Sequence, residues 1–309
     1  DASAPADLAN AGIVSPWTER QGRCGFLDVR PNPDITYQLY GNDVLPASGF
    51  RAEALAAVYD GANPVRMEQL GTQTLGKLAG RGGKPLRDAN GNPVYDWTIM
   101  DQIFDAYAEA GNTPLVQIGF TPEALSDDPG PYQHSWEPAN KYATILTGWA
   151  APPNNLKKWG ALIEAWAQHL ADRYGKEKVS TWPWEVWNEP DGHYWTGTIP
   201  EFCAMYDVSA RAVKKVLPDA RVGGPHTCGA FSNPKAQTFL RAFLKHVVDN
   251  NSPIDFIAFH AKGNPVIWQD HVRMGLHKHL RDIEANLAII NEFPSLTHLP
   301  VIIGESDPE

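Results

Sequence analysis

Long apolar runs and cysteines are both scarce in this sequence. No stretch approaches the roughly 18 consecutive apolar residues that a transmembrane helix needs, so no membrane span is expected. The 309 residues include 3 cysteines, Cys24, Cys203 and Cys228, and their spacing fits no metal-binding template. Buried thiols are the expectation for them, and one disulfide is the alternative if the protein is exported.

Positive charge is in deficit as well. The chain carries 26 Lys and Arg residues against 36 Asp and Glu residues, a net charge of −10 with a pI near 5.5. Nucleic acids and anionic membrane surfaces bind clustered Lys and Arg, so neither is an expected partner. The chain begins at Asp1 rather than Met, and its start contains no apolar signal core. That start fits a mature exported chain or an engineered one, and a periplasmic or secreted location is predicted.

Aromatic residues, in contrast, are abundant. The chain has 11 Trp, 10 Tyr and 11 Phe. Aromatic rings contribute large apolar surfaces to protein cores. An aromatic face also matches the apolar C–H face of a pyranose sugar. Both uses are expected here, for different residues.

Helical and strand patterns alternate along the chain. Helices are predicted at 51–59, 97–110, 155–174, 200–216, 235–250 and 275–291. Strands are predicted at 24–30, 63–68, 114–120, 179–188, 220–225, 254–260 and 300–305. Pro200 fits the first turn of its helix, with Thr198 as the cap. Repeated strand–helix order predicts a parallel sheet.

A (β/α)8 TIM barrel of the α/β class is the predicted fold. Residues 1–50 are expected to form an N-terminal segment with the first strand, and residues 51–309 the barrel. The chain is expected to stop after the seventh strand, with the rest in a missing C-terminal part of the same protein. A doubly wound open sheet is the alternative, but no predicted strand is followed by the GxGxxG pattern of dinucleotide binding.

A long segment rich in Pro, Gly and Asn follows the third predicted strand. It covers residues 121–155. Long loops in compact domains are usually functional, and a loop after a barrel strand lies on the catalytic rim. His134 and Trp136 in this segment are weak candidates for substrate contacts.

Three carboxylates end predicted strands, where barrel enzymes place their chemistry. They are Glu68, Glu189 and Glu305, after strands two, four and seven. Strands four and seven lie on roughly opposite sides of a barrel mouth. Two carboxylates that face each other can act on a glycosidic bond, one as proton donor and one as nucleophile. A salt bridge or a helix cap is the structural alternative for any one of them.

Five stretches together resemble family 39 of the glycoside hydrolases, within a clan of retaining (β/α)8 barrels. They are "PLVQIGFTPEAL" (114–125), "NNLKKWGALIEAWAQHLADRYG" (154–175), "WEVWNEPDGHYWTGT" (184–198), "YDVSARAVKKVLPDARVGGP" (206–225) and "PIDFIAFHAKG" (253–263). The WNEP sequence after an apolar strand is specific to the clan, and the whole set is specific to the family.

The resemblance implies a role for several residues. Glu189 matches the general acid/base, Asn188 the residue that binds the sugar 2-OH, and Glu305 the nucleophile. The two carboxyl groups are therefore expected about 5–5.5 Å apart, as in a retaining mechanism. Arg66 is a candidate counter-charge for the nucleophile, with Asn188 as a second partner. Glu185 is interpreted as a supporting residue, paired with Arg66.

Other positions depart from the xylosidase pattern of this family. Glu68 stands where many xylosidases carry His, and the run from His260 through Lys262 resembles the α-L-iduronidases. The resemblance implies that His260, Lys262 and Glu68 contact substrate, with Lys262 at a uronate carboxylate. Pairing of Lys262 with Glu68 or Glu305 is the alternative. His193 and Trp195 are candidate subsite residues, with packing at the rim as their alternative.

The predicted function is that of a retaining exo-glycosidase. It is expected to remove a terminal xylosyl or arabinosyl unit from a plant or microbial oligosaccharide or polysaccharide, without a cofactor or a metal. A uronidase, an endo-acting exopolysaccharide hydrolase and a non-catalytic carbohydrate-binding barrel are the alternatives. A metal-dependent barrel hydrolase would need an HxH motif after the first strand, and this sequence has none there. The sequence leaves the oligomeric state open.

Overall fold

The computed structural model describes most of the chain between Tyr95 and Asp307. The described residues are Tyr95, 97–109, 113–128, 130, 133–135, 144–146 and 149–307. The predicted helix at 51–59 and the strands at 24–30 and 63–68 lie outside them. The same is true of Arg66, Glu68, Cys24 and Trp136.

Five parallel strands form the central sheet, and they lie side by side in chain order. They are β1 (Val116–Ile118), β4 (Pro183–Val186), β5 (Arg221–Thr227), β6 (Phe256–Lys262) and β9 (Val301–Asp307). A doubly wound sheet reverses its strand order at a switch point, and this sheet does not. The order is that of an arc of a (β/α)8 barrel, which confirms the predicted fold class.

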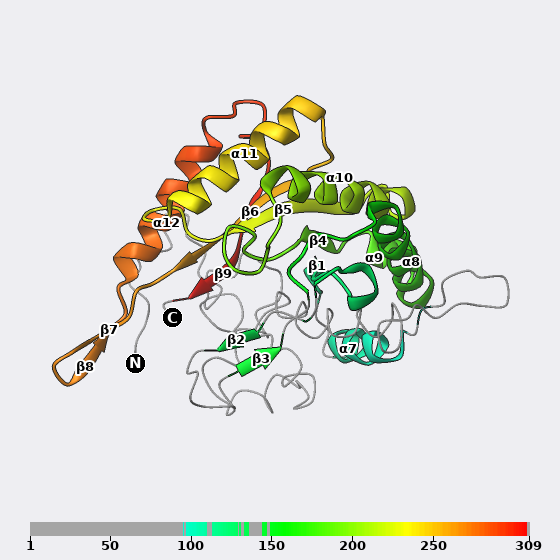
Figure 1. Cartoon of the computed structure of the whole chain (residues 1–309), viewed down its shortest axis with the longest axis horizontal. Coiled ribbons are helices and arrows are strands. Elements are labelled where there is room, and N and C mark those ends of the chain that lie inside the picture. Colours follow the sequence, from blue (N-terminus) through cyan, green and yellow to red (C-terminus); the bar gives the residue numbers. More distant parts are fainter. Residues whose placement is uncertain are drawn as a thin grey trace, which may run out of the picture.

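Helices cover the outer side of this arc (Figure 1). They are α7 (Thr98–Glu109), α8 (Leu156–Tyr174), α9 (Lys176–Val179), α10 (Ile199–Val216), α11 (Pro234–Asn250) and α12 (Leu276–Ile290). Each long helix begins and ends within about two residues of its predicted range. The short helix α9 was not predicted. None of the helices in the described ranges is long and apolar enough to cross a membrane.

Local sequence signals explain where these helices begin. Thr198 accepts a hydrogen bond from the backbone of Glu201, and the Glu201 carboxylate accepts one from the backbone of Thr198. This reciprocal capping box satisfies two amide groups that the first helical turn leaves without partners. Asn155 and Asn233 cap α8 and α11 by a side-chain oxygen that accepts from backbone amides of the first turn, without the reciprocal bond. Thr198 therefore acts as the predicted cap.

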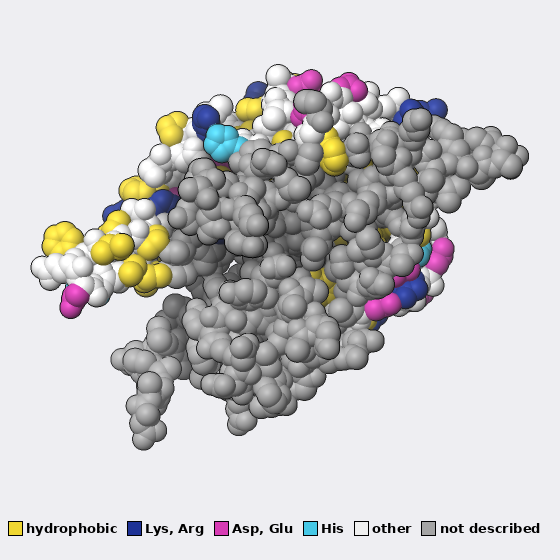
Figure 2. Space-filling view, turned by 60° about the horizontal axis from the view of Figure 1, so that its bottom comes forward, with side chains coloured by type: hydrophobic (Ala, Val, Ile, Leu, Met, Phe, Trp, Pro, Cys, Tyr) yellow, Lys and Arg dark blue, Asp and Glu magenta, His cyan; other side chains and the backbone are white. Residues whose placement is uncertain are grey.

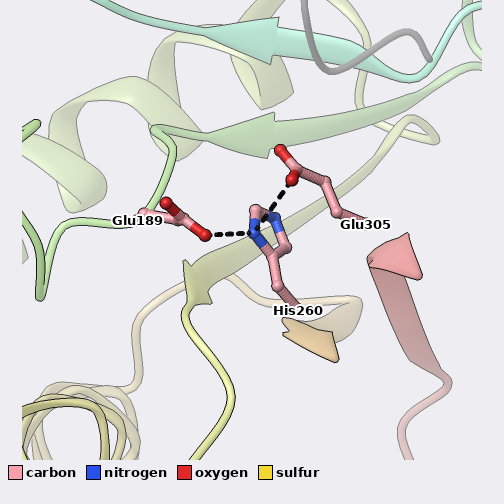
Figure 3. Close-up of side chains that lie close together, drawn as sticks. All are labelled: Glu189, His260 and Glu305. Carbon is pink, nitrogen blue, oxygen red and sulfur yellow. Dashed lines mark hydrogen bonds and ion pairs between the residues drawn. The ribbon is translucent and has the colours of Figure 1, made fainter. Parts of the chain in front are cut away.

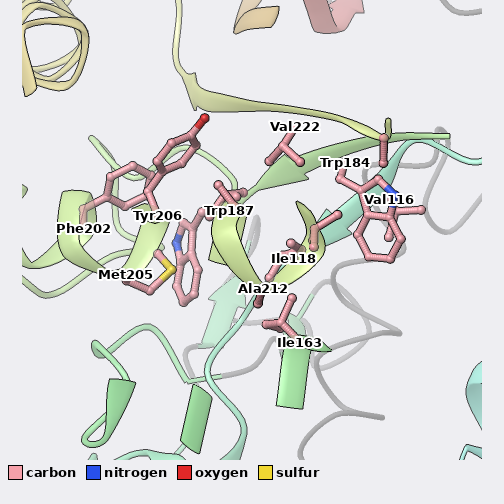
Figure 4. Close-up of a cluster of buried hydrophobic side chains, with 14 of the residues drawn as sticks. Val116, Ile118, Ile163, Trp184, Trp187, Phe202, Met205, Tyr206, Ala212 and Val222 are labelled. Carbon is pink, nitrogen blue, oxygen red and sulfur yellow. The ribbon is translucent and has the colours of Figure 1, made fainter. Parts of the chain in front are cut away.

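Aromatic side chains fill the layer between the sheet and the helices (Figure 4). Trp166 of α8 meets Trp184 of β4 edge-on, with ring centroids 5.6 Å apart. The buried Trp159 donates a hydrogen bond from Nε1 to the Ser209 hydroxyl of α10, over 2.8 Å. Much of the tryptophan content therefore serves core packing, as one of its two expected uses.

Two antiparallel hairpins interrupt the strand–helix alternation. Within the segment 121–155, β2 (Gln133–Ser135) pairs with β3 (Thr144–Leu146), and η3 (Glu123–Leu125) precedes them. After β6, β7 (Val266–Trp268) pairs with β8 (His271–Arg273). This second hairpin extends away from the barrel, and its apolar side chains are exposed (Figures 1 and 2).

Candidate active site

The turn that follows β4 holds its backbone in an uncommon conformation. Trp187 has φ 72° and Glu189 has φ 40°, values in the left-handed region that bulky residues rarely adopt. Two hydrogen bonds hold them there: Trp187 N donates to Ile118 O and Glu189 N donates to His226 O, each over 2.9 Å. Such conformations collect at functional sites, where the surrounding structure enforces them.

Glu189 and Glu305 approach each other through His260 (Figure 3). The Nδ1 atom of His260 lies 2.9 Å from Oε1 of Glu189 and 3.7 Å from Oε2 of Glu305. The imidazole is fully buried, whereas each carboxylate keeps a fraction of its surface exposed. Carboxylates from two different strand ends therefore meet at one buried imidazole.

The separation of the two carboxylates fits the close class of glycosidase sites. One oxygen of Glu189 and one of Glu305 lie within 4.8 Å of each other. Retaining glycosidases place their carboxyl groups about 5–5.5 Å apart, and inverting enzymes about 6.5–9.5 Å. The wide spacing leaves room for a water molecule between carboxylate and sugar. The two oxygens here lie closer together than that wide spacing.

Lys262 supplies a positive charge beside Glu305. Its Nζ atom lies 2.7 Å from Oε2 of Glu305, and both side chains are mostly buried. Of the two pairings considered for this lysine, the structure shows the one with Glu305. Arg66 was the predicted counter-charge and lies outside the described residues. A cation beside a carboxylate favours its ionised form, which a nucleophile needs.

Burial and nearby charges compete at His260. Burial lowers the pKa of this imidazole, because it disfavours the charged form. The negative charges of Glu305 and Glu189 and the hydrogen bond to Glu189 raise the pKa, while Lys262 lowers it. The net pKa is raised, so the paired carboxylates outweigh burial.

The other predicted substrate contacts separate into two groups. Asn188 is buried, and its Oδ1 atom has no hydrogen-bonding partner among the described residues. Trp195 instead belongs to the core: it is 5% exposed and packs edge-on against Trp187 at 5.0 Å. Its packing alternative is therefore favoured over a sugar platform. His193 is exposed on the turn after Glu189.

A buried polar chain lies beneath the two carboxylates. Nε2 of His226 contacts Oε2 of Glu185, and Nδ1 of His226 lies 3.1 Å from Nε2 of His260. Gln117 donates from Nε2 to Oε1 of Glu185 over 2.6 Å. Glu185 was expected to pair with Arg66, which lies outside the described residues, and its partners among the described residues are His226 and Gln117. Sequence reasoning missed His226, although a His at the end of the apolar run "RVGGPHT" was a visible signal.

Asp191 joins the loops that follow β4 and β5. Its carboxylate accepts hydrogen bonds from Cys228 N over 3.0 Å and from Asn233 Nδ2 over 3.2 Å. Burial raises the pKa of Asp191. Burial also raises the pKa of the nearby Cys228 thiol, and the negative charges of Glu189 and Asp191 add to that effect. Cys203 and Cys228 are both free thiols.

Glu189, His260 and Glu305 also have the spacing of a metal-binding group. One ligand atom of each lies within 4.8 Å of the others. The ammonium group of Lys262 contacts the same Glu305 carboxylate, however, and its positive charge opposes a divalent cation at that position. The prediction of a site without a metal stays a prediction.

Comparisons with known proteins agree on one family. The sequence model described as "Glycosyl hydrolases family 39" matches residues 74–309. A beta-xylosidase of Geobacillus stearothermophilus is 35% identical over 176 residues, which cover 56% of this chain and 32% of that protein. A human alpha-L-iduronidase is 26% identical over 166 residues, covering 49% of this chain and 23% of that protein.

A solved structure supports the same relationship. The crystal structure of a monomeric beta-xylosidase from Caulobacter crescentus CB15 superposes with a TM-score of 0.59 and 28% identity. The match covers 83% of this chain and 49% of the solved chain. The chain thus spans about a third or less of the curated relatives and about half of this solved relative.

Proposed function

The chain belongs to glycosyl hydrolases family 39, and we propose that it carries the catalytic centre of a retaining glycosidase. The observation that carries the proposal is the short distance between Glu189 and Glu305 at the ends of two barrel strands. A carbohydrate-binding barrel needs aromatic surfaces but does not need two carboxylates within 4.8 Å. The enzyme is therefore favoured over a binding protein.

Each carboxylate takes one role in a double displacement. Glu305, ionised beside Lys262, attacks the anomeric carbon, and the bond to the leaving oxygen breaks as Glu189 gives that oxygen its proton. Glu189, now a carboxylate, then takes a proton from water, and this water displaces Glu305 from the sugar. The two inversions restore the original anomeric configuration. The buried Asn188 amide is assigned to the 2-OH of the sugar.

A terminal xylosyl or arabinosyl unit is the proposed substrate, cleaved in an exo mode. Two beta-xylosidases support it, each 35% identical over the 176 or 177 residues that align with this chain. The pairing of Lys262 with Glu305 supports it as well, because the lysine charge already has a role at a neutral sugar. The exo mode rests on the segment 121–155, which follows β1 and would close one side of the site. We propose that the protein acts outside the cytoplasm on a plant or microbial glycan.

A uronidase is the second candidate. The iduronidase relative and the position of Lys262, 2.7 Å from the proposed nucleophile, favour it. In a uronidase, this lysine would contact the uronate carboxylate in addition to Glu305. Rates on aryl xylosides, arabinosides and uronides, measured for wild type and Lys262→Ala, separate the two. Selective loss of uronide cleavage in the variant establishes the uronidase instead.

The reaction type is tested with the purified protein. Nuclear magnetic resonance of the first-formed product shows the anomeric configuration, and retention is expected. A 2-deoxy-2-fluoro glycoside inactivator should label the peptide that contains Glu305. Glu292→Gln, at an exposed ion pair with Arg241, is the control variant and should keep wild-type rates. Inversion, or a label on another residue, contradicts the assignment.

Glu189→Gln separates the enzyme from the binding protein. The variant should bind the glycan product and lose hydrolysis of substrates with poor leaving groups, because these need the proton that Glu189 supplies. Treatment with a chelator should leave the wild-type rate unchanged. Chelator-sensitive hydrolysis would favour the metal-dependent alternative.

A further inference from the structure

We infer that Glu185 and His226 are positioning residues, which act through His260 to set where the proton of the acid/base Glu189 is held. The inference rests on the proposed role of Glu189. It concerns two residues that lie beneath the reacting carboxylates, and in the described contacts neither of their side chains reaches the side chain of Glu189 directly. Its basis is a continuous set of buried contacts from Glu185 through both imidazoles to Glu189.

Four side chains from three strands and one turn make this set. Glu185 of β4 contacts Nε2 of His226 on β5, and Nδ1 of His226 lies 3.1 Å from Nε2 of His260 on β6. Nδ1 of His260 then lies 2.9 Å from Oε1 of Glu189. Glu185, His226 and His260 are all 0% exposed, so water does not compete for these contacts.

The carboxylate at one end determines the direction of every hydrogen bond. A carboxylate offers only acceptor oxygens, so the hydrogen at the contact between Glu185 and His226 belongs to Nε2 of the imidazole. Nδ1 of that ring is then the acceptor and takes a hydrogen bond from Nε2–H of His260. His260 therefore presents Nδ1 to Glu189, and one proton is shared across that contact. It lies either on Glu189, as the neutral acid, or on an imidazolium.

The charges that face His260 come from each strand packed around it. Glu189 follows β4, His226 lies on β5, Lys262 follows along β6, and Glu305 comes from β9. The two carboxylates and the one lysine leave the imidazole with a net negative surrounding. That surrounding keeps the shared proton in place, in agreement with the raised pKa of His260.

The backbone of β9 makes room for this arrangement. A Cβ atom placed on Gly304 would lie 2.2 Å from Cε1 of His226, so only glycine fits beside the ring. The pairing of β6 with β9 also shifts register between Phe259 and Ala261 of β6, and the pairing of β5 with β6 shifts between Pro225 and Thr227 of β5. Bulges of this kind re-aim side chains beside active sites. Here they flank His226 and His260.

The contacts of Gln117 determine how the new amide group in the variant Glu185→Gln is oriented. The two amide hydrogens of Gln117 go to Oε1 of Glu185, over 2.6 Å, and to the carbonyl of Trp187, over 3.0 Å. A glutamine at 185 must therefore place its oxygen toward Gln117 and its amide nitrogen toward His226. A donor now faces Nε2 of His226, so each hydrogen bond in the set reverses.

Reversal places a proton permanently on Nδ1 of His260. That nitrogen can then only donate to Glu189, which favours the carboxylate over the neutral acid. Loss of the negative charge at 185 acts in the same direction. The alkaline limb of the kcat/KM profile should therefore move to lower pH, by on the order of one pH unit.

A pair of aryl glycosides isolates this effect. Phenyl glycosides need protonation of the leaving oxygen, and 2,4-dinitrophenyl glycosides do not. At neutral pH, Glu185→Gln should lower the rate on the phenyl substrate by about tenfold relative to the dinitrophenyl substrate. A partly folded preparation lowers both rates by the same factor, so the ratio stays diagnostic. The double variant Glu185→Gln/His226→Leu, which buries no unpaired charge, should change the ratio in the same direction.

A matched control lies on the outer face of the barrel. His169 of α8 pairs with Asp101 of α7 over 2.6 Å. The variant His169→Gln should change neither the alkaline limb of the kcat/KM profile nor the ratio of the phenyl rate to the dinitrophenyl rate. If Glu185→Gln and the double variant both keep the wild-type limb and ratio, the inference is wrong. If Glu189→Gln itself keeps wild-type rates on phenyl glycosides, the proposed function fails first, and the two failures are told apart.

Discussion

The ion pair between Lys262 and Glu305 allows a quantitative prediction for Lys262→Met. The substitution keeps an unbranched side chain and removes the charge. Two unit charges about 4 Å apart interact by about 4 kcal/mol at an effective dielectric constant of about 20. The side chains of Lys262 and Glu305 are 16% and 11% exposed, so solvent screens part of this energy.

His260 reduces the effect further. Lys262 lowers the pKa of His260, so removal of the lysine raises that pKa and places more positive charge 3.7 Å from Glu305. The substitution therefore removes about 1.4–3 kcal/mol of stabilisation from the ionised Glu305 carboxylate, which corresponds to one to two pH units. Glu305 must be ionised to attack, and without the lysine it takes up a proton at higher pH. The acid limb of the kcat/KM profile should therefore move upward by one to two pH units.

The pH dependence of kcat/KM on an aryl xyloside reports the ionisation of the free enzyme and is the assay. Lys214→Met removes a matched lysine, 2.8 Å from Asp255 outside the site, and should leave the profile unchanged. An acid limb that coincides with that of wild type refutes the role given to Lys262. A shift seen with uronides but not with xylosides assigns the lysine to substrate.

Three further predictions concern stability and reactivity. Gly304→Ala should lower the free energy of unfolding by about 1–3 kcal/mol in urea titrations, because the new methyl overlaps His226, and an unchanged midpoint contradicts that packing. Thr198→Ala should cost about 1 kcal/mol by loss of the capping box, seen as a melting temperature about 2–4 °C lower with activity retained. Burial raises the pKa of Cys203 to about 12 and also raises the pKa of Cys228. Iodoacetamide at pH 8 should therefore label these two thiols only after unfolding, as read by peptide mapping that separates them from Cys24, and fast labelling of either one in the native protein contradicts the prediction.

The strand–helix alternation and the site motifs could be predicted because local sequence encodes them. The apolar face of α8 repeats at helical spacing, and Thr198 and Glu201 form a cap from four neighbouring positions. Glu189 and Glu305 could be picked out as a candidate pair because parallel strands end at one edge, where residues converge whatever lies between them. Their roles came from the resemblance to family 39 of the glycoside hydrolases. The order of the strands, and with it the barrel, followed from the same alternation.

The partners within the site were decided only by the tertiary structure. Glu185 and His226 are 41 positions apart in the sequence, and their contact depends on the register between β4 and β5. The pairing of Lys262 with Glu305 likewise depends on a register shift between β6 and β9, which no local pattern encodes. The sequence left Trp195 open between a subsite contact and packing, and the tertiary structure places its ring against Trp187, 5% exposed. The type of a residue and its position in a strand are local properties, whereas the neighbour that influences its charge state depends on long-range packing.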